Sequence, residues 1–221
     1  MNDSPGKILR VIAILFMGLT AAMNLLGGIG TVCAAFLTKQ FPPMWVFLDY
    51  QWLYQSLMIV TILIGLAGVW ATFRLVKGDK TAYRNALILL LVGAVVAAVQ
   101  YFASLAIRGK AAPANVKFYV NVLTLLFFLL LKLPGIRERV NFNQSGGDGV
   151  GQTAAGLTAI ITGLVVLTTS LWVGGSHVYE GANWTFVLTE FLTGSGLLLM
   201  AVGGLTFILP ALKDYLVRAY A

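Results

Sequence analysis

Residues 86–107, ALILLLVGAVVAAVQYFASLAI, decide the fold class, because this long apolar run contains no charged side chain. A helix rises 1.5 Å per residue and needs about 20 apolar residues to cross the hydrocarbon region of a bilayer. Only helices and closed barrels satisfy the backbone there, and the run lacks the alternation of a barrel strand. It is therefore predicted to be a transmembrane helix.

The same pattern recurs along the chain and predicts six spans, at residues 8–36, 52–76, 86–107, 118–133, 154–173 and 185–212. The 221 residues are 59% hydrophobic and only 10% charged, whereas soluble domains are about 45–50% apolar and about 25% charged. We expect one all-α membrane domain, a bundle of six transmembrane helices with short loops. Residues 141–152 are expected to form a glycine-rich linker, and residues 38–50, with Pro42 and Pro43, an ordered loop or re-entrant turn.

The distribution of basic residues predicts the orientation. With the N-terminus inside, the inner segments hold eleven of them: Lys7, Arg10, Arg74, Lys77, Lys80, Arg84, Lys132, Arg137, Arg139, Lys213 and Arg218. The outer segments hold four, Lys39, Arg108, Lys110 and Lys117. This bias predicts that both termini lie in the cytoplasm. We expect the chain to lie in a plasma membrane, such as a bacterial inner membrane. The first span is too long for a signal peptide and is expected to be retained.

Five polar side chains are expected in the outer half of the membrane: Asn24, Gln55, Gln100, Asn121 and Glu190. Glu190 lies six residues past Trp184, or roughly 9 Å below the outer interface. An acidic residue at this depth is costly, so we expect Glu190 to face the bundle interior, a partner or a water pocket. Together the five residues are candidates to line a ligand cavity. Each is also explained by a structural hydrogen bond to a neighbouring helix.

His177, the only histidine, and Glu180 lie in a predicted outer loop and are hypothetical ligands of a metal or pigment. A single histidine cannot supply both axial ligands of a bis-His haem, and we expect no cofactor to be bound by this chain alone. Cys33, the only cysteine, excludes an intrachain disulfide. The chain has no phosphate-binding loop, HExxH, GxSxG or CxxC motif, which disfavours phosphoryl transfer, zinc proteolysis and serine hydrolysis.

The opening residues 8–19, ILRVIAILFMGL, resemble the first spans of small bacterial membrane proteins such as the DoxX-like group. The resemblance covers about one span. DoxX-like proteins have four spans and this chain is expected to have six, so it implies no functional residue here.

Three functions are compatible with these observations. The first is a non-catalytic accessory or scaffold subunit of a larger membrane complex, such as a respiratory or photosynthetic one, whose partners are other membrane subunits and lipids. The second is a transporter or quinone-binding protein with its polar cavity around Glu190. The third is an enzyme acting on lipid or quinone through His177 with Glu180 or Glu190. Nucleic acid is not an expected partner, because the basic residues lie at the ends of the predicted spans and form no patch.

Overall fold

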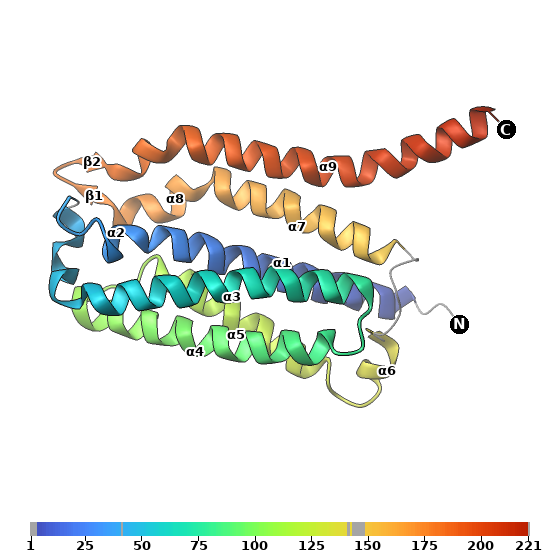
Figure 1. Cartoon of the computed structure of the whole chain (residues 1–221), viewed down its shortest axis with the longest axis horizontal. Helices are drawn as coiled ribbons and strands as arrows, with labels where there is room; N and C mark the ends of the chain where they lie inside the picture. The colour runs from blue at the N-terminus through green and yellow to red at the C-terminus, as the bar shows by residue number, and fades with distance from the viewer. Residues whose placement is uncertain (1–3, 41, 141, 143–148, 221) are drawn as a thin grey trace.

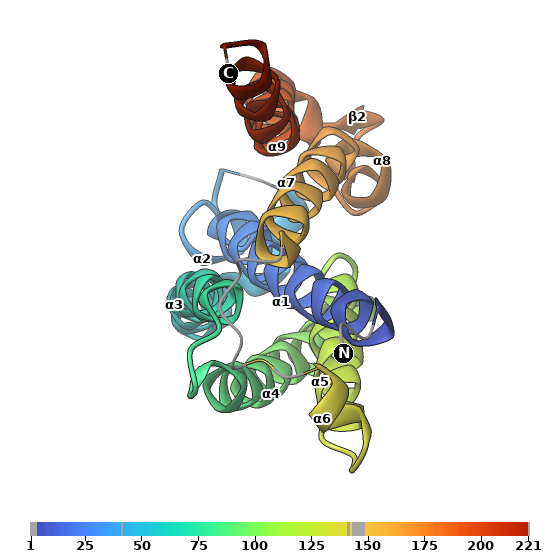
Figure 2. The ribbon, with the colours of Figure 1, turned by 90° about the vertical axis from the view of Figure 1, so that its right-hand side faces the viewer.

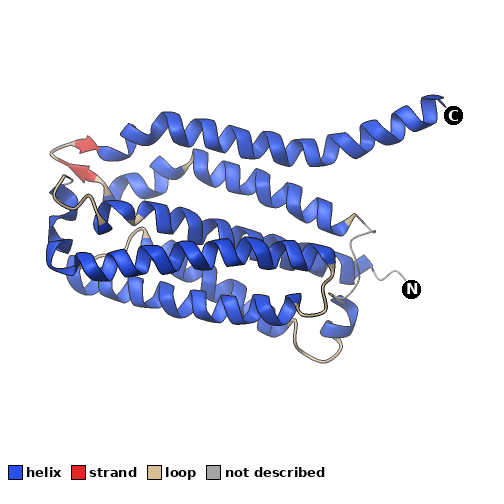
Figure 3. Cartoon of the chain, in the orientation of Figure 1, coloured by secondary structure: helices blue, strands red, loops and turns tan. Residues whose placement is uncertain are grey.

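The computed structural model describes residues 4–40, 42–140, 142 and 149–220, and almost all of this part of the chain is helical (Figure 3). The long helices are α1 (Ser4–Gly30), α3 (Gln51–Lys77), α4 (Ala82–Arg108), α5 (Ala114–Leu130), α7 (Val150–Leu167) and α9 (Thr189–Tyr220). The short helical elements are α2 (Val32–Ala35), α6 (Ile136–Val140), α8 (Thr169–Val173), η1 (Pro42–Tyr50), η2 (Gly174–Ser176) and η3 (Trp184–Leu188). Strands β1 (Val178–Tyr179) and β2 (Ala182–Asn183) form a small antiparallel hairpin.

Within the described residues, five helical segments are long and apolar enough to cross a membrane: Pro5–Ala35, Met44–Lys77, Ala82–Arg108, Val150–Leu167 and Thr185–Leu209. Helix α5 is apolar too, but has only 17 residues. The prediction of an all-α protein is confirmed, and the length and apolar composition of these five helices are consistent with membrane spans.

Several element boundaries differ from those expected. Helix α5 begins four residues before the predicted span at 118–133, and α7 begins four residues before the one at 154–173. The predicted span 8–36 is interrupted at Thr31, between α1 and α2, and the segment around Pro42 forms the 3-10 helix η1. Most of the predicted linker 141–152 lies outside the described residues.

The helices form two groups (Figures 1 and 2). Helices α1, α3, α4 and α5 pack in a ring, here called the four-helix half, in which neighbours contact each other. Helix α7 packs against the outside of α1, and α9 packs against α7. Both termini lie at one end of the molecule. The opposite end, here called the far end, carries α2, η1 and the β1–β2 hairpin (Figure 1).

Two apolar clusters occupy the ends of the four-helix half. The cluster toward the termini includes Ile14, Leu75, Leu90 and Phe128, all at most 1% exposed. The cluster at the far end lies among α2, η1 and α3 and includes Phe47 and Tyr54, each 2% exposed. Between the two clusters lie Thr20 and Asn24 of α1 and Thr31 directly after it, which are buried and polar. A polar layer therefore separates the two apolar clusters.

Glycines hold the α7–α9 pair at close range. A Cβ atom on Gly163 would lie 2.6 Å from the carbonyl oxygen of Gly196, and one on Gly203 would lie 2.7 Å from that of Gly156. Small residues of this kind let helix backbones approach in lipid, where packing drives association. No larger side chain fits at these positions without separating the two helices.

Candidate functional site

Lys117 is the centre of the polar layer. Helix α5 begins at Ala114, directly after Pro113, a residue that favours the start of a helix. Lys117, Asn121 and Thr124 then follow at helical spacing on the face of α5 that the bundle buries. Lys117 is only 3% exposed. The prediction that it belongs to an outer loop was wrong, because the helix starts one turn earlier than the apolar run.

The ammonium of Lys117 donates hydrogen bonds to two neighbouring helices. Its Nζ lies 3.1 Å from Oγ1 of Thr61 on α3 and also donates to Oε1 of Gln100 on α4. Gln100 in turn donates through Nε2 to Oγ1 of Thr31 over 2.9 Å, and Thr31 donates to the Gly27 carbonyl over 2.6 Å. Because an ammonium has three N–H donors, one donor of Lys117 has no partner among the described residues.

A reciprocal amide pair lies one turn from Lys117. Asn24 donates to Oδ1 of Asn121 over 3.1 Å, and Asn121 donates to Oδ1 of Asn24 over 3.3 Å. One turn further, the hydroxyls of Thr20 and Thr124 are 2.7 Å apart. We call these eight buried residues the Lys117 network: Thr20, Asn24, Thr31, Thr61, Gln100, Lys117, Asn121 and Thr124.

The network lies well inside the bundle. Thr61 is ten residues from the start of α3, and Gln100 is eight residues from the end of α4, which is about 12–15 Å from the far end of these helices. A basic residue at the centre of a membrane helix costs about 2.5–3.5 kcal/mol on insertion scales. In the described part of the chain no carboxylate pairs with Lys117, so neutral oxygens alone compensate the cation.

The far end of the network is covered by packed side chains. The Tyr54 hydroxyl lies 2.9 Å from Oγ of Ser104, and Gln55 donates to the Ala35 carbonyl over 3.1 Å. Gln51 donates to Oγ1 of Thr38 over 2.5 Å. These bonds join α2 and the segment after it to α3, and α3 to α4.

A groove of about 450 Å³ adjoins the network on the side of α7. It lies between α1, α5 and α7, and its walls are mainly apolar. Thr124, a member of the Lys117 network, lines it together with Thr162 and Trp172. The Thr162 hydroxyl is buried and has no hydrogen-bond partner in the described part of the chain. The groove therefore offers an apolar volume beside a polar centre.

The structure brings together three of the five residues predicted to share a cavity. Asn24, Gln100 and Asn121 belong to the Lys117 network, whereas the half-buried Gln55 bonds to the backbone of α2 at the far end. Glu190, in the first turn of α9, is exposed on the surface of this chain. Of the three surroundings expected for Glu190, the bundle interior is therefore excluded, because α9 contacts α7 along its glycine side, and a partner or a water pocket stay predictions.

His177 and Glu180 lie outside the network, beside and within the β1–β2 hairpin at the far end. His177 is half-buried, with Nδ1 3.1 Å from the Val173 carbonyl oxygen, and burial lowers the pKa of its imidazole below the usual value. Glu180 is exposed and adopts a positive φ of 49° in the hairpin turn. No cluster of three or more His, Cys, Asp or Glu able to hold a metal occurs in the described segments.

Sequence reasoning missed Lys117, although two signals pointed to it. Pro113 marks a helix start, and Lys117, Asn121 and Thr124 share one helical face. Hydropathy alone begins the span at residue 118, directly after the lysine. The predicted span therefore left out Lys117, the central residue of the site.

The fold and the site define a class: an all-α polytopic protein with a buried lysine in a polar layer between apolar helices. Comparison with family models, curated proteins and solved structures gave no match to this chain. The resemblance of residues 8–19 to the DoxX-like group therefore assigns no family.

Proposed function

We propose that this protein binds a lipid-soluble molecule whose head accepts a hydrogen bond, with a quinone as the simplest case. The observation that carries the proposal is Lys117, a buried cation without a carboxylate partner in the described residues and with one unused donor. Ionisable groups inside a membrane are rare and mark functional sites by default. This retains the ligand-site hypothesis and moves its centre from Glu190 to Lys117.

The groove between α1, α5 and α7 supports a ligand of mixed character. Its apolar walls suit a ring substituent or isoprenoid chain, and Thr124 joins it to the Lys117 network. Small-molecule sites usually combine a mostly apolar lining with a few placed polar groups. In this proposal the head displaces the Gln100 oxygen or takes the third donor of Lys117.

We also propose a topology of six spans with both termini in the cytoplasm and the far end outside. Helix α5 has 17 residues and extends about 25 Å, close to the thickness of a bilayer core. With Lys117 inside the bundle, the outer segments retain only Lys39, Arg108 and Lys110, against eleven basic residues in the inner segments. That bias supports a bacterial inner membrane, or another plasma membrane, as the location.

The binding test uses a soluble short-chain benzoquinone and the tryptophan fluorescence of the protein, to which Trp172 in the groove contributes as one of five tryptophans. Wild type, Lys117→Met and Lys117→Arg are purified and titrated. Lys110→Met is the matched control, because it removes one positive charge from a loop. Hydrogen bonds to charged groups contribute about 1.5–3 kcal/mol, so Lys117→Met should weaken binding about tenfold to a hundredfold. Unchanged affinity in Lys117→Met, or equal loss in Lys110→Met, would refute the proposal.

A second candidate function is that of an accessory subunit in a larger membrane complex, and helix α9 favours it. Only 11% of the most apolar window of the segment Thr185–Leu209, most of which is α9, is buried, against 44% for the segment that contains α1. Leu198, Val202 and Leu205 lie exposed along it. Such a face suits lipid or a partner helix.

Purification from native membranes in mild detergent separates the two candidates. Partner chains in a fixed ratio, identified by mass spectrometry together with an absorption spectrum, would support the subunit proposal. A lone, stable protein would leave the ligand site as the surviving proposal.

A further inference from the structure

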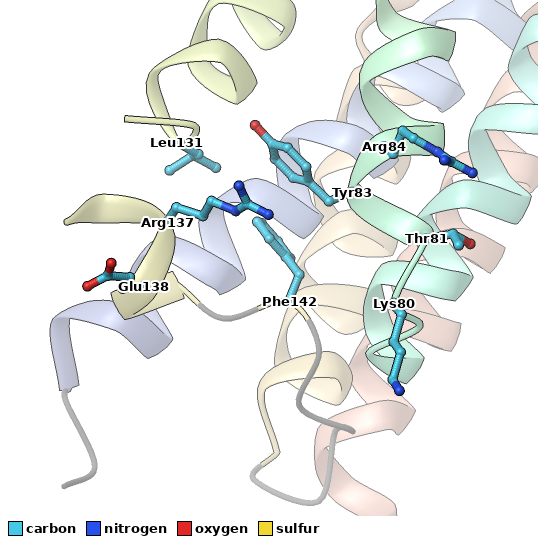
Figure 4. A pocket seen from close by; sticks show the side chains of 8 residues that line it. All are labelled: Lys80, Thr81, Tyr83, Arg84, Leu131, Arg137, Glu138 and Phe142. Atoms are coloured by element: carbon cyan, nitrogen blue, oxygen red, sulfur yellow. The ribbon is translucent and has the colours of Figure 1, made fainter. Parts of the chain in front are cut away.

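A second cavity, of about 690 Å³, lies at the end of the four-helix half where the termini lie, opposite the far end (Figure 4). It is formed by the segment that begins α4 and by α6 with the residues after it. Three basic side chains line it: Lys80 and Arg84 from the α4 side, and Arg137 from α6. Basic residues thus line the cavity from both sides; Figure 4 shows Arg137 turned toward Tyr83 and Phe142, and Arg84 and Lys80 extending away from these rings.

The three cations are not neutralised by the protein around them. Within the described residues, none of them forms an ion pair or hydrogen bond, although Glu138 also lines the cavity. Figure 4 shows the Glu138 carboxylate pointing away from the guanidinium of Arg137. The nearby Asp79 is already paired with Arg74. The cavity therefore carries an excess of two positive charges.

The wall of the cavity next to Arg137 is aromatic (Figure 4). Tyr83 stacks against Phe142 and Phe128, with ring centroids 5.3 Å and 5.8 Å apart. The Tyr83 hydroxyl is occupied, because it donates to the Phe128 carbonyl over 2.5 Å. Leu131 completes the wall and is 3% exposed. An apolar wall next to Arg137, in a cavity lined by two further cations, matches a molecule with an anionic head and an apolar body.

We infer that this cavity binds the headgroup phosphate of an anionic phospholipid. Arginine recognises phosphate oxygens through paired N–H donors, and the Arg137 guanidinium points toward Tyr83 and Phe142 (Figure 4). Basic pockets at the cytoplasmic ends of transmembrane helices bind such headgroups. A lipid is favoured over a soluble phosphate because the aromatic wall continues into the apolar cluster around Leu90 and Phe128.

The test measures lipid binding by the full-length protein in detergent. Retained lipids are counted by native mass spectrometry, and thermal unfolding is followed with added phosphatidylglycerol, phosphatidylcholine or inorganic phosphate. The variants are Arg84→Gln/Arg137→Gln and, as a matched control, Lys132→Gln/Arg139→Gln. The control removes the same charge from exposed residues outside the cavity. A basic residue near an anionic lipid surface is worth roughly a fivefold change in affinity.

Wild type and the control should retain phosphatidylglycerol in preference to phosphatidylcholine, and the cavity variant should lose roughly 25-fold in affinity. Equal retention of the two lipids, or equal loss in the control variant, would overturn the inference. Stabilisation by inorganic phosphate as large as that by phosphatidylglycerol would show that the cavity takes a soluble anion and would overturn the lipid assignment. The Lys117 site is far from these substitutions, so quinone binding is not affected by either result.

Discussion

The four-helix half and the α7–α9 pair solve the same physical problem in different ways. In lipid, helices gain little from apolar burial against each other, so close packing and hydrogen bonds must hold them together. The four-helix half uses both, with side-chain hydrogen bonds joining α1, α3, α4 and α5 through the Lys117 network. The α7–α9 pair depends mainly on glycines that bring two backbones together. Polar contacts specify which helices meet, whereas glycine contacts set how closely they meet.

The largest expected effect comes from filling a glycine contact between α7 and α9. In Gly203→Leu the new side chain meets the Gly156 carbonyl and the backbone of Ile160, neither of which can move aside. Overpacking typically costs about 1–3 kcal/mol, and a backbone obstacle places this variant at or above about 3 kcal/mol. Thermal unfolding in detergent measures the loss.

The adjacent Gly204→Leu is the matched control, because a Cβ atom there meets nothing within 4 Å. It should unfold close to wild type. Equal unfolding temperatures for the two variants would show that the glycine contact does not hold the pair.

A smaller effect is expected from breaking the amide pair of the four-helix half. Asn121→Leu leaves the buried Asn24 without its partner across the helix interface. An unsatisfied buried polar group costs about 1–3 kcal/mol, whereas replacing both partners is nearly neutral. The double variant Asn24→Leu/Asn121→Leu should therefore recover part of the loss in a double-mutant cycle. Strict additivity of the two single variants would contradict a direct interaction.

The hydroxyl pair of Thr20 and Thr124 should contribute less. Interhelical hydrogen bonds in membranes average about 0.6 kcal/mol and reach about 1.7 kcal/mol. Thr20→Val and Thr124→Val each remove one hydroxyl of the 2.7 Å contact while keeping the side-chain shape. Denaturation in mixed micelles should give losses within that range. A loss above about 2 kcal/mol would mean that Thr124 has a further role, such as one in the groove.

The α3–α4 loop provides the smallest effect, and it depends on pH. Hydrogen bonds from Arg74 and Thr81 lower the pKa of Asp79 to about 2, from an ordinary value of 3.8. Because the folded-state pKa is depressed, the stabilisation is fully present above the unfolded value and is lost as the pH falls from 3.8 toward 2. Unfolding of wild type and Asp79→Asn is compared across this window, where only wild type should lose the Asp79 contribution. Identical pH profiles would remove Asp79 from the account.

Much of the fold could be predicted from sequence, because hydropathy reports directly on the solvent around a helix. The depth of Asn24, Gln100 and Asn121 along their helices also followed from counting residues. The direction in which a side chain points could not be predicted in this way, because packing against neighbouring helices sets the rotation of each helix about its axis. Glu190 illustrates this: its position along α9 was readable, but its exposed face was not. Lys117 was missed for a different reason. Its charge was taken to exclude it from the span, although Pro113 places the start of the helix before it.

The most direct test of the account is the accessibility of position 117. Lys117→Cys and Lys110→Cys are made in a Cys33→Ala background and treated with a membrane-impermeant maleimide, in intact cells and in opened membranes. The account predicts rapid labelling of Lys110→Cys, in the α4–α5 loop, and almost no labelling of Lys117→Cys on either side of the membrane. Labelling of Lys117→Cys as fast as that of Lys110→Cys would place residue 117 in water and contradict the buried network.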